Sequence, residues 1–248
     1  MIEVRNLSKV FPDGTRALDD VSLTINDGEF IAIIGLSGAG KSTFLRCLNR
    51  LNDPTGGQVL IDGEDIARAR GSELRKLRRK VGFIFQQFNL ATRLTALENV
   101  LAGRLGYHNR LAGVLGLYTS EDREKAIRAL KRVGLSEKVS TRASSLSGGQ
   151  QQRVAIARAV AQDPSLVLAD EPMASLDPKL SRVIMNILRD FNQDGLTVIV
   201  NVHVLELATD YATRILGFNK GRVVFDGPPS ALTPAEVERV YHGSVADL

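Results

Sequence analysis

A glycine-rich loop at residues 35–43 carries the clearest chemical signature in the sequence. It reads G-L-S-G-A-G-K-S-T and matches the phosphate-binding pattern G-x-x-x-x-G-K-[ST], between an apolar run and a helix-like segment. Its glycines let backbone N–H groups turn toward phosphate oxygens, and the helix N-terminus adds partial positive charge. Lys41 supplies a full charge for the β- and γ-phosphates, and the Ser42 hydroxyl can ligate Mg²⁺. The loop therefore predicts a triphosphate site with Mg²⁺, whose other binding residues are Gly35, Ser37, Gly38, Ala39, Gly40 and Thr43.

Two acids follow the apolar run Leu166–Ala169. In a parallel sheet, ligands bind outside the carboxyl ends of the strands, so both acids would lie near the phosphates. We expect Asp170 to reach Mg²⁺, directly or through water. Successive side chains of a strand alternate, so Glu171 faces another way and can act as general base for an attacking water. A polar strand end is common, and this interpretation depends on the phosphate-binding loop.

Gln86 and His203 end two further apolar runs, Val81–Phe85 and Thr197–Val202. We expect both side chains at the same edge of the sheet, where they join the catalytic set. His203 could donate to the γ-phosphate or hold the attacking water, and Gln86 could contact Mg²⁺ or water without competing as a strong ligand. Each also fits an ordinary polar strand end, the interpretation we give to His108 and His242 as structural or exposed residues.

A second glycine-rich helix start reads L-S-G-G-Q at residues 146–150. Ser147 is a good helix N-cap, and Gly148, Gly149 and Gln150 open the helix, so this end can bind another anion. One chain needs only one phosphate-binding helix end for ATP. We therefore expect a two-fold dimer in which the second site of each chain closes over the nucleotide of its partner.

The elements that position these residues alternate along the chain. Apolar, β-branched runs predict buried strands, and between residues 88 and 163 the pattern turns helical. After Pro164 strand patterns return, which indicates an α/β core interrupted by a helical insert. A hairpin-like turn is expected at Asn26-Asp27-Gly28. The remaining predicted strands are Val21–Ile25, Phe30–Ile34, Gln58–Ile61 and Val223–Phe225.

Composition excludes several classes of protein. The chain has 248 residues, of which 44% are hydrophobic and 24% charged, as in ordinary globular domains. Its apolar runs fall far below the roughly 18–20 residues that span a bilayer, and no secretory signal is expected. The single Cys47 excludes a disulfide framework and is expected to be a buried apolar residue. The net charge of +4 neither requires nor excludes nucleic acid or an anionic membrane.

The order and spacing of these motifs resemble the ATP-binding cassette (ABC) ATPases over nearly the whole chain. The resemblance implies an α/β fold: a P-loop NTPase core with an antiparallel β subdomain and an inserted α-helical subdomain. Residues 1–248 would then form a single ABC ATPase domain. Its parts would be a nucleotide-binding core at 1–87 and 164–227, a helical subdomain at 88–163 and a C-terminal helical tail at 228–248.

The resemblance also implies roles for individual residues. Ser147, Gly148, Gly149 and Gln150 would bind the γ-phosphate across the dimer, and Asp177, in S-L-D at 175–177, would couple the two sites. Glu171 would be the catalytic base. Phe11 lies where the family places an aromatic that stacks on adenine, although a core or strand-edge aromatic is the alternative. ATP and Mg²⁺ are the implied ligands, with Ser42, Gln86 and Asp170 around the metal.

Three classes within the family compete: a transporter subunit, a soluble ATPase acting on nucleic acid or ribosomes, and a non-hydrolysing module. The interval between Gln86 and Ser147 is too short for the long coiled coil of chromosome-organising relatives. Translation-linked relatives carry two cassettes, and a degenerate module would lack Lys41, Glu171 or His203. These observations favour the energising subunit of a transporter.

Four strings resemble the ATPases of phosphonate-type importers: 82–90, 93–101, 146–159 and A-D-E-P-M-A-S-L-D at 169–177. The expected solute is a phosphonate or a related phosphorus oxyanion. An importer for an amino acid or an inorganic anion is the alternative, and a soluble non-transport ATPase is a weaker one. The order N-V-H-V at 201–204 departs from the commoner pattern, in which glutamine or glutamate follows the histidine.

The resemblance implies partners and a location. They are a second copy of this chain, an integral-membrane permease dimer and, indirectly, an extracytoplasmic solute-binding protein. The chain would lie on the cytoplasmic face of the membrane, with no nucleic acid partner. The basic stretch Arg75–Lys80 is interpreted as a solvated helix face that lacks the interleaved aromatics of a nucleic-acid site. The glycine-containing stretch Leu101–Tyr118 either faces the membrane partner or is a packed helix-loop segment.

Overall fold

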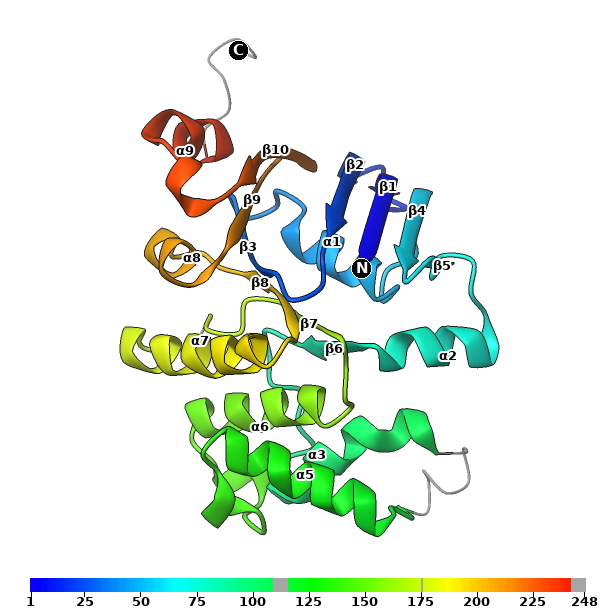
Figure 1. Cartoon of the computed structure of the whole chain (residues 1–248), viewed down its shortest axis with the longest axis vertical. Helices are drawn as coiled ribbons and strands as arrows, with labels where there is room; N and C mark the ends of the chain where they lie inside the picture. Colours follow the sequence, from blue (N-terminus) through cyan, green and yellow to red (C-terminus); the bar gives the residue numbers. More distant parts are fainter. Residues whose placement is uncertain (109–115, 175, 242–248) are drawn as a thin grey trace.

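The computed structural model describes residues 1–108, 116–174 and 176–241. Two β-sheets lie in the upper part of Figure 1, and a group of helices lies below them. The strands are β1 (Ile2–Val10), β2 (Arg16–Ile25), β3 (Phe30–Ile34), β4 (Gly56–Ile61), β5 (Glu64–Asp65), β6 (Val81–Ile84), β7 (Leu166–Ala169), β8 (Thr197–Asn201), β9 (Arg214–Asn219) and β10 (Arg222–Gly227).

The α-helices are α1 (Lys41–Leu48), α2 (Gly71–Arg79), α3 (Ala96–Leu101), α5 (Ser120–Arg132), α6 (Gly148–Val160), α7 (Pro178–Gln193), α8 (Leu205–Tyr211) and α9 (Pro234–Tyr241). Short 3₁₀ helices connect them: η1 (Ala102–Tyr107), η2 (Ser136–Lys138), η3 (Ala143–Ser145) and η4 (Pro229–Ala231). No helix in the described ranges is long and apolar enough to cross a membrane.

The two sheets differ in strand direction, and the mainly parallel sheet positions the candidate site. The six-stranded sheet has the order β10-β9-β3-β8-β7-β6 and is parallel except for β10. The four-stranded sheet has the order β2-β1-β4-β5 and is antiparallel. The expectation of a hairpin at Asn26-Asp27-Gly28 is wrong, because β2 and β3 belong to different sheets and this turn joins them. The parallel order places the carboxyl ends of β3, β6, β7 and β8 at one edge.

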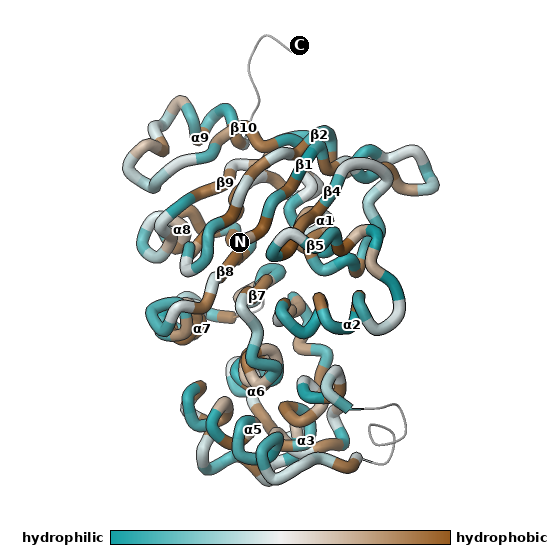
Figure 2. The backbone as a smooth tube through the Cα atoms, turned by 45° about the vertical axis from the view of Figure 1, so that its right-hand side comes forward, coloured by the Kyte–Doolittle hydropathy of each residue, from teal (hydrophilic) through white to brown (hydrophobic). Residues whose placement is uncertain are grey.

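Two hydrophobic clusters hold the layers together. The strand β3 contributes Phe30, Ala32 and Ile34 to one cluster, and Ile31 and Ile33 to the other. This alternation explains why the strand is apolar throughout, since both of its faces are covered. In Figure 2 the brown, hydrophobic stretches concentrate in the strands, whereas α2 is largely teal.

Helix α1 fills the space between the two sheets. Its Phe44 packs 5.2 Å from the ring of Phe218 on β9, measured between ring centroids. Cys47 is fully buried, as expected, and burial raises the pKa of its thiol to about 12. The helix that carries the phosphate-binding residues is therefore fixed by apolar contacts on the sides that face the two sheets.

The described segments between residues 88 and 163 are helical, as the sequence predicts. Capping boxes start three of these helices: Thr95 with Glu98, Thr119 with Asp122 and Ser147 with Gln150. In each box, two otherwise unpaired backbone N–H groups find side-chain acceptors. The core of these helices is continuous with one face of the six-stranded sheet. The exact division at residues 88 and 163 stays a prediction.

Two segments that the sequence singled out are described only in part. Residues 109–115 of the stretch 101–118 lie outside the described residues, as do His242 and the rest of the predicted tail beyond Tyr241. The described tail comprises η4 and α9. The basic stretch Arg75–Lys80 ends the exposed helix α2, where only Leu77 is buried, and leads into β6. The expected α/β fold, with an antiparallel β part and an inserted helical part, is confirmed.

Candidate active site

The phosphate-binding loop connects β3 to α1, and its glycines are required by close contacts. A Cβ atom on Gly35 would lie 2.2 Å from the carbonyl oxygen of Phe218, and one on Gly40 would lie 2.3 Å from that of Ala17. Both glycines also have positive φ values, 142° and 102°, which side chains rarely tolerate. Gly40 caps α1 without a side-chain bond, so the first N–H groups of the helix can turn to an anion.

Lys41 is folded onto the loop that contains it. Its Nζ donates to the carbonyl oxygens of Gly35 and Leu36, both at 2.8 Å, and only 4% of the residue is exposed. Burial lowers the pKa of its ammonium group, and the nearby charges of Glu171 and Asp170 partly oppose this. A buried cation with three donors and two neutral acceptors is poised to bind an anionic oxygen.

The carboxylate of Asp170 is the centre of the polar cluster beside the loop. Ser42 Oγ donates to its Oδ1 at 2.6 Å, and Asn201 Nδ2 donates to the same oxygen at 2.9 Å. Arg46 donates to Oδ2 at 3.1 Å. Asp170 is 1% exposed, so the three donors compensate the cost of burying its charge. The sequence predicted the proximity of Ser42 and Asp170, and the structure brings them together.

Glu171 turns away from Asp170 and meets His203. The distance between Glu171 Oε1 and His203 Nε2 is 2.6 Å. Glu171 has a φ of 50°, a left-handed conformation that costs about 1–2 kcal/mol for a residue with a side chain. This backbone turn directly follows β7. The structure thus brings Glu171 and His203 together at the edge of the sheet where both were expected, and their direct contact is an addition to that prediction.

Gln86 and Glu171 line two adjoining cavities. The first, of about 300 Å³, lies over the phosphate-binding loop and includes Ser37, Lys41 and Ser42 in its wall. The second, of about 530 Å³, is lined on its other sides by residues that include Asn201, His203 and Pro178. These two shared side chains connect the loop to the region of His203.

The helix start at residues 146–150 does not meet the phosphate-binding loop of its own chain. Ser147 caps α6, accepting from the backbone N–H of Gln150, while its own N–H donates to Gln150 Oε1 at 2.9 Å. Ser147 and Gly148 are exposed, and neither lines the cavity over the loop. In Figure 1, α6 belongs to the lower group of helices, whereas α1 lies among the strands above. An anion bound at both places needs two chains.

Phe11 and Asp177 lie outside the cavity over the loop. Phe11 is half-buried in the turn between β1 and β2, and the ammonium of Lys9 lies 5.2 Å from its ring centroid. Ala17, further along the same hairpin, does line the cavity. Asp177 caps α7 by accepting from the backbone N–H of Leu180 at 2.9 Å. Ser175 of the S-L-D motif lies outside the described residues. The roles of Phe11 and Asp177 stay predictions.

The donor set around Asp170 fits Mg²⁺. This ion prefers oxygen ligands, keeps several waters and takes only one or two carboxylates from protein. Ser42 Oγ and Asp170 Oδ1 supply two such oxygens 2.6 Å apart, and the amide of exposed Gln86 lies in the wall of the same cavity. Among the described residues, no cluster of three or more histidine, cysteine, aspartate or glutamate side chains could hold a metal ion.

Sequence reasoning missed two residues of this cluster, Arg46 and Asn201. Arg46 lies one turn after Ser42 on α1, and side chains four apart share a helix face. Asn201 is a polar residue at the end of a strand that is otherwise apolar apart from Thr197, and it is fully buried. Both signals are present in the sequence. The spacing of four residues places Arg46 on the same face of the helix as Ser42, and a polar residue that ends a buried strand needs a hydrogen-bond partner.

The profile of the family described as ABC transporter matches residues 18–174, which contain the phosphate-binding loop, the L-S-G-G-Q segment and the acidic pair. The chain belongs to the ABC transporter family. This family membership carries ATP hydrolysis with it.

Curated relatives and solved structures agree with this assignment. The chain is 54% identical to "Phosphonates import ATP-binding protein PhnC" of Shouchella clausii, over 97% of this chain and 91% of that one. It is 53% identical to the protein of the same name in Bacillus thuringiensis, over 99% and 96%. Among structures, a dimeric post-hydrolysis ATP-binding cassette, MJ0796, bound to ADP and Pi has a TM-score of 0.81 at 41% identity, covering 92% of this chain and 99% of that one.

Proposed function

We propose that this chain is the ATP-hydrolysing subunit of an importer for phosphonate or a related phosphorus oxyanion. Two copies work together beneath a separate permease dimer on the cytoplasmic face of the membrane, and an extracytoplasmic protein delivers the solute. The observation that carries the proposal is the cluster of Ser42, Asp170, Glu171 and His203 around one phosphate-binding loop. The names of relatives at 50–54% identity support the choice of solute.

Within one chain, the site separates binding from proton transfer. The loop N–H groups and Lys41 hold the triphosphate, while Ser42, Gln86 and Asp170 would hold Mg²⁺, which neutralises charge on the phosphates. Glu171 lies on the other side of the cluster, where its carboxylate can take a proton from a water aimed at the γ-phosphate. His203 is within 2.6 Å of that carboxylate and orients it.

Across the dimer, the exposed start of α6 completes the site. The N–H groups at Gly148 and Gly149, with the Ser147 hydroxyl, face the γ-phosphate held by the partner. ATP then joins the two copies, and loss of the γ-phosphate lets them part. The similarity to the dimeric post-hydrolysis state of MJ0796 bound to ADP and Pi supports this arrangement. Asp177, at the start of α7, lies at the interface and couples the two sites in this proposal.

The activity is tested with Glu171→Gln, which keeps the shape of the side chain but removes the base. We expect turnover to fall by at least about 10²-fold, while ATP binding persists. The variant should also accumulate as an ATP-bound dimer in size-exclusion chromatography. Glu124→Gln on the exposed face of α5 is the matched control. Wild-type turnover in Glu171→Gln would refute the assigned base.

The solute is tested by growth of a strain that lacks this gene on single phosphorus sources. We expect no growth on a phosphonate, normal growth on inorganic phosphate, and recovery with the wild-type gene but not with Glu171→Gln. Uptake of labelled amino acids should be unchanged. Normal phosphonate use in the deletion strain, with loss of uptake of another solute, would establish the alternative importer.

A further inference from the structure

Asn201 is a buried amide in the middle of the catalytic cluster, and the mechanism above does not use it. It is the last residue of β8 and pairs in parallel register with Ile33 of β3, the strand that leads into the phosphate-binding loop. It is 0% exposed. Its side chain thus sits between the strand that carries the loop and β7, the strand that precedes Asp170.

The amide has a fixed orientation, because its neighbour is a carboxylate. Nδ2 lies 2.9 Å from Asp170 Oδ1, and an ionised carboxylate can only accept. The nitrogen must therefore face Asp170. This contact is made to the same oxygen that accepts from Ser42. Asn201 consequently fixes the rotation of the carboxylate that is paired with the Ser42 hydroxyl.

The other end of the amide is an acceptor without a donor. Oδ1 of Asn201 is buried, and no donor from the described residues reaches it. The residue lines the cavity that also contains Gln86, Glu171 and His203. Buried polar atoms normally have a partner, so this acceptor is available to a donor that is not among the described residues. The waters that Mg²⁺ retains are donors of the right kind.

We propose that Asn201 is a positioning residue for the metal–nucleotide site: Nδ2 orients Asp170, and Oδ1 accepts a hydrogen bond from a water of the hydrated cation. The inference depends on the proposed function. It explains why a polar residue ends a strand whose other members, Thr197 aside, are apolar. Outer partners of metal ligands typically change metal affinity or activity by about 10- to 100-fold when removed.

The test uses Asn201→Leu, which removes both polar atoms at similar size. The probe is Mn²⁺ with ATP, and its affinity is measured by electron paramagnetic resonance on the full chain. We expect Mn²⁺ affinity in the presence of ATP to fall by about 10-fold or more, while metal-free ATP binding stays within about twofold. Asn201→Thr, whose hydroxyl can donate to Asp170, should recover part of the Mn²⁺ affinity.

Asn49→Leu is the matched control, since Asn49 is also buried with an unpaired Oδ1 but lies at the end of α1, away from Asp170. It should leave Mn²⁺ affinity unchanged, and thermal unfolding confirms that each variant is folded. Wild-type Mn²⁺ affinity in folded Asn201→Leu would overturn the inference and leave the proposed function standing. Failure of the wild-type chain to bind Mn²⁺ with ATP would instead refute the proposed function.

Discussion

Asp170 and Asp122 are both buried aspartates held by an arginine and a hydroxyl group, but they lie in different parts of the molecule. Asp170 follows β7 at the edge of the six-stranded sheet and is 1% exposed, whereas Asp122 lies in the first turn of α5 and is 3% exposed. Similar burial and similar partners therefore do not by themselves mark a catalytic residue.

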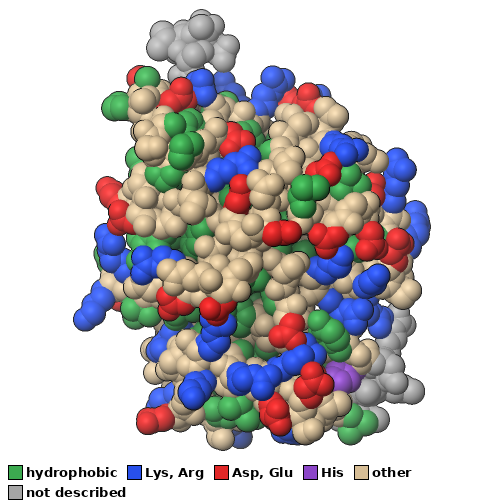
Figure 3. Space-filling model, in the orientation of Figure 1, with side chains coloured by type: hydrophobic (Ala, Val, Ile, Leu, Met, Phe, Trp, Pro, Cys, Tyr) green, Lys and Arg blue, Asp and Glu red, His purple; other side chains and the backbone are tan. Residues whose placement is uncertain are grey.

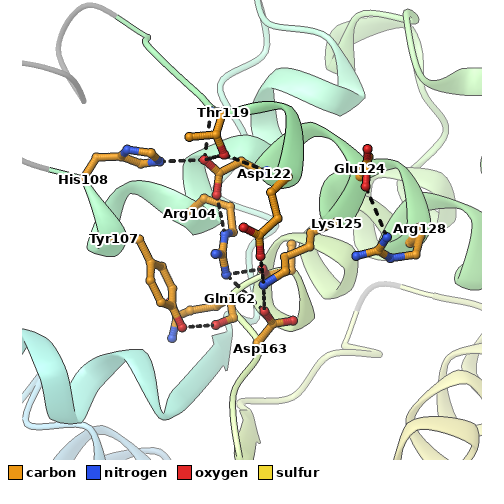
Figure 4. A network of polar contacts seen from close by, with 12 residues as sticks. Arg104, Tyr107, His108, Thr119, Asp122, Glu124, Lys125, Arg128, Gln162 and Asp163 are labelled. Carbon is orange, nitrogen blue, oxygen red and sulfur yellow. Dashed lines mark hydrogen bonds and ion pairs between the residues drawn. The ribbon is translucent and has the colours of Figure 1, made fainter.

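Both carboxylate oxygens of Asp122 have hydrogen-bond partners within the helical part of the molecule. Arg104 and His108 each donate to it or contact it at 2.8 Å, and Thr119 binds it through both its hydroxyl and its N–H (Figure 4). Arg104 also donates to the carbonyl oxygen of Ala161. Both oxygens of the Asp122 carboxylate thus accept from partners among the described residues, and these hydrogen bonds hold η1 against α5.

The surroundings of Asp170 differ, because one of its partners still has an unpaired hydrogen-bonding group. Ser42, which donates to it, lies in the first turn of α1 directly after the glycine-rich loop, and Asn201 Oδ1 has no donor among the described residues. Glu171 next to it adopts a left-handed backbone. Strain and unpaired polar groups gather at functional sites because the rest of the fold compensates for them. This difference, rather than burial, separates the two aspartates.

In Figure 3 charges of both signs are interspersed over the visible face.

The largest expected effect that sharpens this comparison comes from Asp170→Asn. It should lower ATP turnover by about 10²–10³-fold, because the amide lacks the negative charge with which Asp170 is proposed to hold Mg²⁺, the cation that would neutralise charge on the phosphates. Its midpoint of thermal unfolding should fall less than that of Asp122→Asn, because the amide oxygen still accepts from Ser42 and Asn201, and the Arg46 side chain that loses its partner is 44% exposed to water. A steady-state ATPase assay with calorimetry checks both. If Asp170→Asn instead unfolded at a much lower temperature and its folded fraction kept normal ATPase activity, Asp170 would have a structural role and not the assigned role in the site.

The same substitution in the helical part, Asp122→Asn, should have the opposite signature. It removes the shorter of the two ion pairs of the buried Arg104 guanidinium and leaves only the contact to Asp163 at 3.3 Å. We therefore expect the free energy of unfolding to fall, by at most about 3–5 kcal/mol. Turnover of the folded fraction should stay near that of the wild type. Urea unfolding gives the first quantity and the ATPase assay the second, with Glu124→Gln on the same helix as control.

The pH dependence of stability is a smaller effect. Burial raises the pKa of Asp122, but hydrogen bonds from Arg104, Thr119 and His108 outweigh it and hold the pKa well below the ordinary value of 3.8. Its contribution is therefore present above that value and is lost as the pH falls toward the lower, folded pKa. The difference in unfolding free energy between wild type and Asp122→Asn should shrink below about pH 4. A difference that grows there would contradict the assignment.

Sequence patterns predicted the candidate site better than the hydrogen bonds around Asp122, because recognisable motifs and strand ends mark the residues of the site. Lys41 and Ser42 share one loop, and Asp170, Glu171 and His203 each follow an apolar strand, so parallel-sheet geometry brings them together. The partners of Asp122 come from η1 and from its own capping box, and no periodicity links Arg104 to Asp122. The sheet order was likewise beyond the pattern, which is why the turn after β2 was wrongly predicted as a hairpin.

The central claim is that ATP is held between the phosphate-binding loop of one copy and the start of α6 of another. It is tested by disulfide formation between Ser37→Cys and Ser147→Cys, two exposed positions, in a chain that also carries Cys47→Ala and Glu171→Gln. The account predicts a covalent dimer that forms with ATP and Mg²⁺ and not without nucleotide. ATP binding without any nucleotide-dependent link between the two chains would contradict it.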